Sequence, residues 1–497
     1  MKAYGSDEFA WFGHSGIPAS ANIPTNLLIG GEWRPGSSGE RIPVHNPFND
    51  EILTTIADAT VKDGLAAVDA AHGAAASWAA TPSRERAEIL RKCYDNITKN
   101  SDWLAHLISL EMGKALSDSQ GELLYAAEFF RWYSEEAAHI RGEIQDAPSG
   151  SNKIVAQYQP IGISLLITPW NFPAAMATRK IAPALAAGCT VILKPAIETP
   201  LTAFAIAKIL MDSGVPPGVV NVITPSDPDA VCSAIMHDTR VRKLSFTGST
   251  PVGRKLLATA AETVLNCSME LGGNSPFIVF DDADLTEAVN GAMLAKMRNG
   301  GQACTAANRF YVQAGIAKAF SESLIAKMAA MKLGNGIDPQ TELGPVVSRK
   351  HADKIAGLVD GAIADGATVA LGGVRPDGKG YFYPATVLTD VPASARILRE
   401  EIFGPVATIM TFDTEEEAIR MANDTENGLS AYVYTGNLKR GLRLSQELEF
   451  GMVGLNRGLL SEPAAPFGGT KQSGLGREGS YHGIMEFTEC QYIAVAW

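Results

Sequence analysis

Four short apolar runs, each followed by a helical pattern, constrain the fold of this 497-residue chain more than any other feature. The runs are predicted to be strands at Gly162–Thr168, Thr190–Lys194, Val219–Ile223 and Lys243–Phe246. The helices are expected at roughly 172–187, 200–213, 227–237 and 250–263. Regular strand–helix alternation predicts an α/β fold with a parallel, doubly wound sheet. Such sheets bind ligands beyond the carboxyl ends of their strands, so we expect a nucleotide site there.

The segment before this series is mainly helical. A strand and turn are predicted over Leu27–Trp33. Apolar residues then recur at helical spacing in four segments, Val61–Trp78, Ser83–Lys99, Asp102–Met112 and Gly121–Arg141. A chain of this length is too long for one compact core, so we expect two or three lobes.

A second α/β series begins at Glu270. Phe277–Phe280 is predicted to be a strand, and Asp284 with Glu287 resembles a capping box at the start of a helix. The helix is expected to end in the run 298–301, directly before Cys304. Both Glu270 and Cys304 are therefore predicted to lie on loops held by regular elements, where reacting groups are usually found.

Two further segments are predicted to be strands without a place in either lobe. One surrounds the turn at 148–151, and the other is the alternating tail Phe487–Val495. Both are candidates for pairing with a neighbouring subunit. Residues 1–25 are rich in Gly, Ser, Ala and Pro and are expected to form a loosely held arm.

Charge and composition exclude several classes of partner. The net charge of −12 comes from acidic residues spread along the chain without a basic tract, which argues against nucleic acid. Pro169, Pro173 and Pro183 interrupt the most apolar region, so no membrane span is expected. The N-terminus has neither signal-peptide nor transit-peptide character, which favours the cytoplasm. Six separated cysteines without a Cys-x-x-Cys pair suggest free thiols, and no metal site is predicted.

Cys304 and Glu270 form a pair suited to covalent catalysis. A thiolate attacks a carbonyl and leaves again from a thioester, while an enclosed carboxylate removes a proton from water. Taken singly, an isolated Cys is more often a small buried hydrophobe, and an isolated Glu a solvated charge. Gly248–Gly253 is a relative of the glycine-rich dinucleotide fingerprint, in which the helix after Ser249 binds pyrophosphate. The alternative is an ordinary tight turn with a helix cap.

Seven motifs, in order along nearly the whole chain, resemble the aldehyde dehydrogenase superfamily. They are Pro169-Trp170-Asn171-Phe172-Pro173, Lys194-Pro195-Ala196, Phe246-Thr247-Gly248-Ser249, Glu270-Leu271-Gly272-Gly273, Gly301-Gln302-Ala303-Cys304, Glu401-Ile402-Phe403-Gly404-Pro405 and Pro466-Phe467-Gly468-Gly469. The resemblance implies a Rossmann-type cofactor domain (1–138 and 160–269), an α/β catalytic domain (270–479) and a small β oligomerisation flap (139–159 and 480–497). It also implies a homodimer or homotetramer.

The resemblance assigns roles to three catalytic residues. Cys304 attacks an aldehyde, and the Asn171 amide with the Cys304 backbone N–H holds the oxyanion, a contact worth about a hundred- to a thousandfold in rate. Hydride passes to a nicotinamide, and water activated by Glu270 hydrolyses the thioester. Asn171 can also act as a helix cap.

The family pattern places the cofactor on Trp170, Lys194, Gly248, Ser249, Leu271, Glu401 and Phe403. Ile197 occupies the position where many NAD-preferring members have a ribose-binding Glu. Without that carboxylate a 2′-phosphate meets less repulsion, so the cofactor is expected to be NADP or NAD, with NADP slightly favoured. The adjacent Glu198 weakens this inference.

Within the superfamily, the runs 270–285 and 471–479 are similar to succinate-semialdehyde dehydrogenases. That subgroup binds the substrate carboxylate with two arginines and a serine, which here are Arg179, Arg298 and Ser461. Alternatively, Arg179 is a charge on a helix surface, Arg298 complements a helix C-terminus, and Ser461 is a polar residue of a loop. Ala306 replaces a second Cys found in many members, so no regulatory disulfide is expected.

Several related activities remain open. Glutarate semialdehyde or another ω-carboxy aldehyde is the nearest alternative substrate, because one methylene in a pocket is worth only about 1–3 kcal/mol. Arg457 adds positive charge near Ser461 and leaves the substrate's chain length open. A coenzyme A-acylating enzyme is a second alternative, against which Glu270 argues, and a non-catalytic relative is a third.

Overall fold

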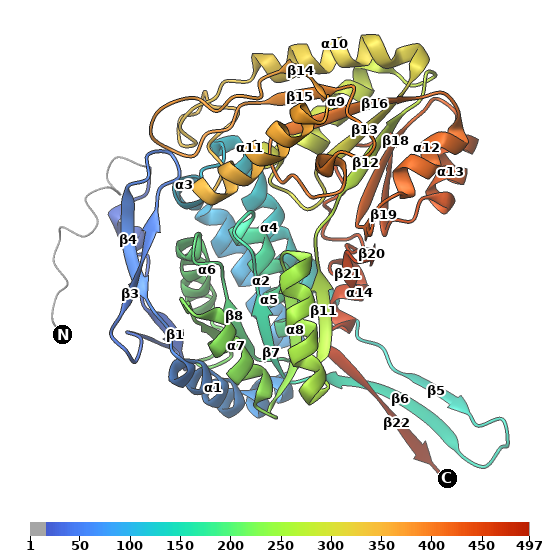
Figure 1. Ribbon diagram of the computed structural model, residues 1–497. Helices are drawn as coiled ribbons and strands as arrows, with labels where there is room; N and C mark the ends of the chain where they lie inside the picture. Colours follow the sequence, from blue (N-terminus) through green and yellow to red (C-terminus); the bar gives the residue numbers. More distant parts are fainter. Residues whose placement is uncertain (1–15, 497) are drawn as a thin grey trace.

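The computed structural model describes residues 16–496, which form two α/β lobes and a projecting three-stranded sheet (Figure 1). The first lobe has an eight-stranded sheet in the order β2-β1-β9-β8-β7-β10-β11-β21. Its strands are β1 Leu27–Ile29, β2 Glu32–Arg34, β7 Ile163–Ile167, β8 Val191–Lys194, β9 Val220–Val222, β10 Val241–Thr247, β11 Asn266–Glu270 and β21 Gly474–Leu475. Strands β7 to β11 run parallel, which confirms the predicted doubly wound sheet.

Eight helices belong to the first lobe. They are α1 Val61–Ala80, α2 Ser83–Lys99, α3 Ser101–Met112, α4 Leu116–Glu136, α5 Pro173–Ala187, α6 Pro200–Asp212, α7 Pro228–His237 and α8 Thr250–Thr263. The predicted bounds Gly121–Arg141 of the fourth helix are wrong. Gly113 ends α3 with φ 93°, so a new helix begins soon after it, and the chain leaves α4 early to reach β5 at Glu143.

The second lobe has a seven-stranded sheet in the order β14-β15-β16-β13-β12-β18-β19. Its strands are β12 Ser275–Val279, β13 Ala307–Gln313, β14 Thr368–Leu371, β15 Thr386–Thr389, β16 Val406–Phe412, β18 Ser430–Tyr434 and β19 Met452–Leu455. Its helices are α9 Leu285–Met297, α10 Ala314–Ala330, α11 Arg349–Ala364, α12 Glu415–Asn423 and α13 Leu438–Glu447. Asp284 caps α9 by accepting a hydrogen bond from the Glu287 N–H at 3.0 Å, which is one half of the predicted capping box.

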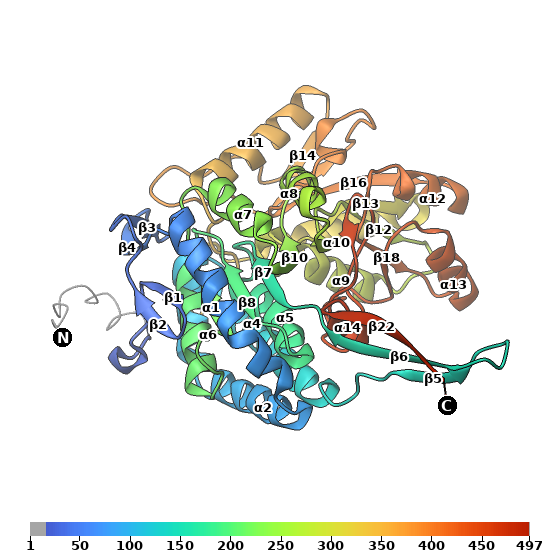
Figure 2. The same ribbon diagram turned by 90° about the horizontal axis from the view of Figure 1, so that it is seen from below.

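Two segments far apart in the sequence form the projecting sheet. Strands β5 Glu143–Asp146, β6 Lys153–Pro160 and β22 Thr488–Val495 pair in the order β22-β6-β5 and extend away from both lobes (Figures 1 and 2). Both predicted orphan segments are therefore strands. Between β21 and β22, α14 Ser480–Met485 packs against α4 and α5, so this part of the C-terminal segment lies on the first lobe.

Smaller elements complete the architecture. Strands β3 Arg41–His45 and β4 Ile52–Ala57 form one hairpin, and β17 Asn427–Gly428 pairs with β20 Thr470–Lys471. Most of the predicted arm at 1–25 lies outside the described residues. Within 16–496, no helix has a stretch that is both long and apolar enough to cross a membrane.

Candidate active site

The loop that carries Cys304 is shaped by three residues with positive φ. Asn299, Gly300 and Gly301 have φ values of 55°, 57° and 74°, which end the helical segment and turn the chain before β13. A methyl group on Gly301 would lie 2.1 Å from the Gly404 carbonyl oxygen, so only glycine fits there. Cys304 follows in a half-buried position, and all six cysteines are free thiols.

Glu270 and Asn171 come to Cys304 from the carboxyl ends of parallel strands. Glu270 is the last residue of β11, and Asn171 follows β7. Because β7, β10 and β11 are parallel neighbours, their ends meet at one edge of the sheet. The loop after Glu270 touches the Cys304 loop closely, since a methyl group on Gly273 would lie 2.1 Å from the Cys304 carbonyl oxygen.

A cavity of about 210 Å³ contains all three predicted catalytic residues, Asn171, Glu270 and Cys304. Six of the eight predicted cofactor residues also line it, namely Trp170, Gly248, Ser249, Leu271, Glu401 and Phe403. The other two lie elsewhere. Lys194 ends β8, and Ile197 lines a separate hollow together with Glu198.

The cofactor side of this cavity offers an anion site and aromatic walls. Ser249 precedes α8 without capping it through its side chain, so first-turn N–H groups remain available for a phosphate. Trp170 and Phe403 pack edge to face, with ring centroids 5.3 Å apart. These features fit a dinucleotide.

Asn171 is held by buried neighbours. Its backbone carbonyl accepts hydrogen bonds from the Lys114 ammonium at 2.6 Å and the Asn299 amide at 2.8 Å. Its side-chain amide donates to the Gln302 carbonyl at 3.0 Å, which leaves its second N–H for another acceptor. Lys114 is itself paired with Glu122 at 2.6 Å. The loop before the nucleophile and α4 together fix the direction of the Asn171 amide.

The three predicted carboxylate-binding residues line a second, smaller cavity with Cys304. The Arg298 guanidinium donates to the Ser461 hydroxyl at 3.2 Å. Arg179 lies fully buried, with Nε 2.5 Å from Oε2 of Glu478 and its guanidinium 4.3 Å from the Phe467 ring centre. Arg179 is therefore not a helix surface charge. The structure brings Arg179, Arg298 and Ser461 together in a cavity that includes Cys304 but not Glu401.

Known proteins with the same architecture are numerous. The family model described as "Aldehyde dehydrogenase family" matches residues 33–493. The chain belongs to the aldehyde dehydrogenase family.

Individual relatives agree with this family assignment. A succinate-semialdehyde dehydrogenase of Paenarthrobacter nicotinovorans is 53% identical over 90% of this chain and 99% of its own. A glutarate-semialdehyde dehydrogenase of Pseudomonas putida is 44% identical over 94% and 97%. The crystal structure of an Escherichia coli NADP-dependent enzyme superimposes with a TM-score of 0.95 at 44% identity, covering 97% of this chain and 99% of that one.

Burial raises the pKa of both reacting groups of this aldehyde dehydrogenase. Burial raises the pKa of the Glu270 carboxyl well above its usual range, and the nearby Glu478 carboxylate raises it further. Burial also raises the pKa of the Cys304 thiol to about 12. The Arg179 guanidinium opposes this shift, whereas the carboxylates of Glu401 and Glu270 add to it. The side chains alone therefore leave Cys304 as a thiol at neutral pH.

Two further residues of the dehydrogenase reach the cofactor side from α11 and were not predicted. His351 packs against Trp170 with ring centroids 5.2 Å apart, and its Nε2 lies 2.7 Å from the Phe403 carbonyl oxygen. Burial lowers the pKa of His351 to about 4, so it is neutral at pH 7. Lys354 donates to the Glu401 carbonyl oxygen at 2.8 Å. Neither residue lies in a recognisable motif, so the sequence offered no indication of them.

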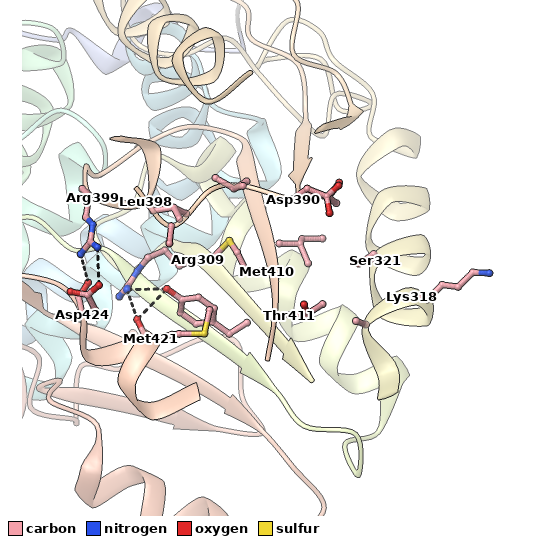
Figure 3. Close-up of a pocket in the computed structure, with 16 residues that line it drawn as sticks. Arg309, Lys318, Ser321, Asp390, Leu398, Arg399, Met410, Thr411, Met421 and Asp424 are labelled. Carbon is pink, nitrogen blue, oxygen red and sulfur yellow. Dashed lines mark hydrogen bonds and ion pairs between the residues drawn. The ribbon is translucent and has the colours of Figure 1, made fainter. Parts of the chain in front are cut away.

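A larger cavity of the dehydrogenase, about 480 Å³, lies in the second lobe, away from Cys304, between α10 and α12 (Figure 3). Its charged groups already have partners. Arg309 donates to the carbonyl oxygens of Asn274, Met421 and Ala422 at 2.8–3.0 Å, and Arg399 pairs with Asp424 at 2.8 Å. Among its lining residues there is no cysteine or histidine to react. Size alone therefore does not identify the active site.

Proposed function

We propose that this aldehyde dehydrogenase oxidises an aldehyde that carries a remote carboxylate, with succinate semialdehyde as the substrate and succinate as the product. The observation that supports this most is the cavity shared by Arg179, Arg298, Ser461 and Cys304. Guanidinium groups bind carboxylates in a planar, bidentate manner that an ammonium does not reproduce. The name of the relative from Paenarthrobacter nicotinovorans agrees with this substrate.

Glutarate semialdehyde is the second candidate, because the Pseudomonas putida relative bears that name. The space among the polar groups of the smaller cavity is about 20 Å³. The two substrates differ by one methylene, so a comparison of their rates decides between them.

The residues of the site divide the reaction between them. Cys304 attacks the aldehyde carbon as a thiolate, and the free N–H of the Asn171 amide with the Cys304 backbone N–H stabilises the oxyanion. When bound, the dinucleotide supplies the hydride acceptor. Glu270 then removes a proton from the water that hydrolyses the thioester. For this step the Glu270 carboxyl group must already be ionised. Because Glu270 can activate water, water rather than coenzyme A is the proposed acyl acceptor.

NADP or NAD serves as the cofactor in this proposal, with NADP slightly favoured. Trp170, Glu401, Phe403 and the start of α8 at Ser249 hold the dinucleotide, with Lys194 and Leu271 as further contacts. Ile197 leaves the ribose 2′ position without the carboxylate that would repel a phosphate. The Escherichia coli relative, described as an NADP-dependent enzyme, agrees with this preference.

The projecting sheet serves self-association in this proposal. Ile144 on β5 and Tyr492 on β22 are 70% and 61% exposed, so both edge strands present apolar side chains to a partner. We propose a homodimer or homotetramer that acts in the cytoplasm on a small aldehyde, without nucleic acid or a membrane as partner. The cofactor domain then comprises 1–138 and 160–269, the catalytic domain 270–479, and the oligomerisation flap 139–159 and 480–497.

One panel of initial rates tests the substrate and the cofactor together. It compares succinate semialdehyde, glutarate semialdehyde and butanal, each with NAD and NADP. We expect kcat/KM to be highest for succinate semialdehyde and higher with NADP than with NAD. A higher value for butanal contradicts the carboxylate site, and a strong NAD preference contradicts the argument from Ile197.

A further inference from the structure

The smaller cavity has polar groups without a role in the proposed reaction, and the Tyr125 hydroxyl is one of them. Tyr125 lies on α4, and its side chain lines the cavity together with Arg179, Arg298 and Ser461. Its hydroxyl oxygen is buried and interacts with the Arg179 guanidinium, but no described residue accepts the hydroxyl proton. A buried O–H without an acceptor is unfavourable, so an acceptor that enters the cavity gains a hydrogen bond from it.

The surroundings of this hydroxyl contain an excess of donors. Among the residues that line the cavity, none is Asp or Glu. The nearest carboxylate that faces Arg179 belongs to Glu478, and both of its oxygens are engaged, Oε2 with Arg179 and Oε1 with the Lys180 ammonium at 2.5 Å. Arg179, Arg298 and the hydroxyl residues Tyr125, Thr305 and Ser461 therefore line a cavity whose lining has no carboxylate, and Nη2 of Arg179 donates to the Met176 sulfur at 3.2 Å.

The phenol is suited to donate rather than to accept a proton. Burial raises the pKa of the Tyr125 hydroxyl, although the charge of Arg179, a hydrogen bond with Arg179 and the charge of Arg298 act in the opposite direction. The hydroxyl is thus protonated at neutral pH. The Tyr125 ring is held by a T-shaped contact with the ring of Phe129, whose centroid lies 4.8 Å away.

We propose that Tyr125 is a specificity-determining residue whose hydroxyl donates a hydrogen bond to the carboxylate of the aldehyde substrate. The inference rests on the proposed carboxylate specificity and adds a fourth donor to Arg179, Arg298 and Ser461. A carboxylate has about four acceptor positions on its two oxygens, which four converging donors can satisfy. An uncharged aldehyde leaves the Tyr125 hydroxyl unpaired and gains nothing from it.

The test is Tyr125→Phe, which removes one oxygen and preserves the ring. We expect kcat/KM for succinate semialdehyde to fall about tenfold, mainly through a higher KM, because a hydrogen bond to a charged group is lost. The value for butanal should stay within about twofold of the wild type. The matched control is Tyr133→Phe on the same helix, since the Tyr133 hydroxyl already donates to the Ser480 carbonyl at 3.1 Å. This control should leave the ratio of the two kcat/KM values unchanged.

The outcomes separate this inference from the proposed function. If the wild-type enzyme shows no preference for succinate semialdehyde over butanal, both are overturned. If the wild type prefers the charged aldehyde and Tyr125→Phe retains the full preference, only the role of Tyr125 is overturned. Equal losses with both aldehydes, or a ratio that shifts as much in Tyr133→Phe, show a general packing role and also overturn it.

Discussion

The two cavities that meet at Cys304 differ in the charge of their walls. The cofactor side carries the carboxyl groups of Glu270 and Glu401, and the substrate side carries the guanidinium groups of Arg179 and Arg298. Lys354 is the exception on the cofactor side, where its ammonium is bound to the Glu401 carbonyl oxygen. An oxidised nicotinamide is cationic and a substrate carboxylate is anionic. Above about pH 7, where Glu401 is mostly ionised, the difference matches each ligand to a wall that carries the opposite charge.

Removing the thiol is expected to have the largest effect, because Cys304 is the one reacting group that both cavities share. Cys304→Ser should lower kcat at least about 10⁴-fold, since loss of a nucleophile removes the covalent route. Binding of NADP, followed by fluorescence titration, should remain within a few-fold of the wild type. Cys490→Ser is the control, because Cys490 is exposed on β22. Turnover retained in Cys304→Ser would refute the assignment of the nucleophile.

Removing one guanidinium should affect one cavity and spare the other. Arg298→Gln is expected to lower kcat/KM for succinate semialdehyde about 100-fold, because a charge-assisted contact to the carboxylate is lost. The KM for NADP and the kcat/KM for butanal should change little. The control is Arg457→Gln, an exposed arginine near Ser461 in the chain that lies outside the cavity lining. An equal loss with butanal would show that Arg298 serves the general structure of the site.

Sequence motifs predict most of both cavity walls, and the residues they miss lie on long helices. Strand ends and short motifs such as 246–249 and 270–273 carry most of the cofactor wall, and the doubly wound topology brings them to one edge. His351 and Tyr125 come from long helices with no local motif. Only tertiary packing of α11 and α4 brings them to Cys304, so neither periodicity nor spacing indicates their function.

Sequence-based reasoning also misjudged local boundaries where tertiary structure decides. Helical periodicity placed the fourth helix at 121–141, whereas α4 spans Leu116–Glu136 because the chain must reach β5. Strand β21 joins the first sheet antiparallel to β11, although Gly474 and Leu475 are far from that sheet in sequence. A strand of two residues is too short to show a periodic pattern, so the sequence does not predict this pairing. The pairing nonetheless anchors the segment that supplies Glu478 to Arg179.

The smallest expected effect is a change in the pKa of the Cys304 thiol. It compares the two cavities directly, because charged groups of the two cavities shift this pKa in opposite directions. The carboxylate of Glu401 raises the pKa of Cys304, and the guanidinium of Arg298 lowers it. Burial raises the pKa of Glu401 itself to about 7, so Glu401 is mostly ionised at pH 8. At that pH Glu401→Gln should lower the Cys304 pKa and increase the thiolate fraction, whereas Arg298→Gln should raise the pKa and decrease it.

The rate of iodoacetamide alkylation at pH 8 reports this fraction, since only the thiolate reacts. Without cofactor we expect alkylation of Cys304 to be about two- to tenfold faster in Glu401→Gln and slower by a similar factor in Arg298→Gln, changes that correspond to at most about one pKa unit. Mass spectrometry of the peptide that contains Cys304 separates its reaction from that of the exposed Cys490. Changes of the same sign in both variants would show that the rate follows access to the thiol, and the electrostatic contrast between the two cavities would then not govern Cys304.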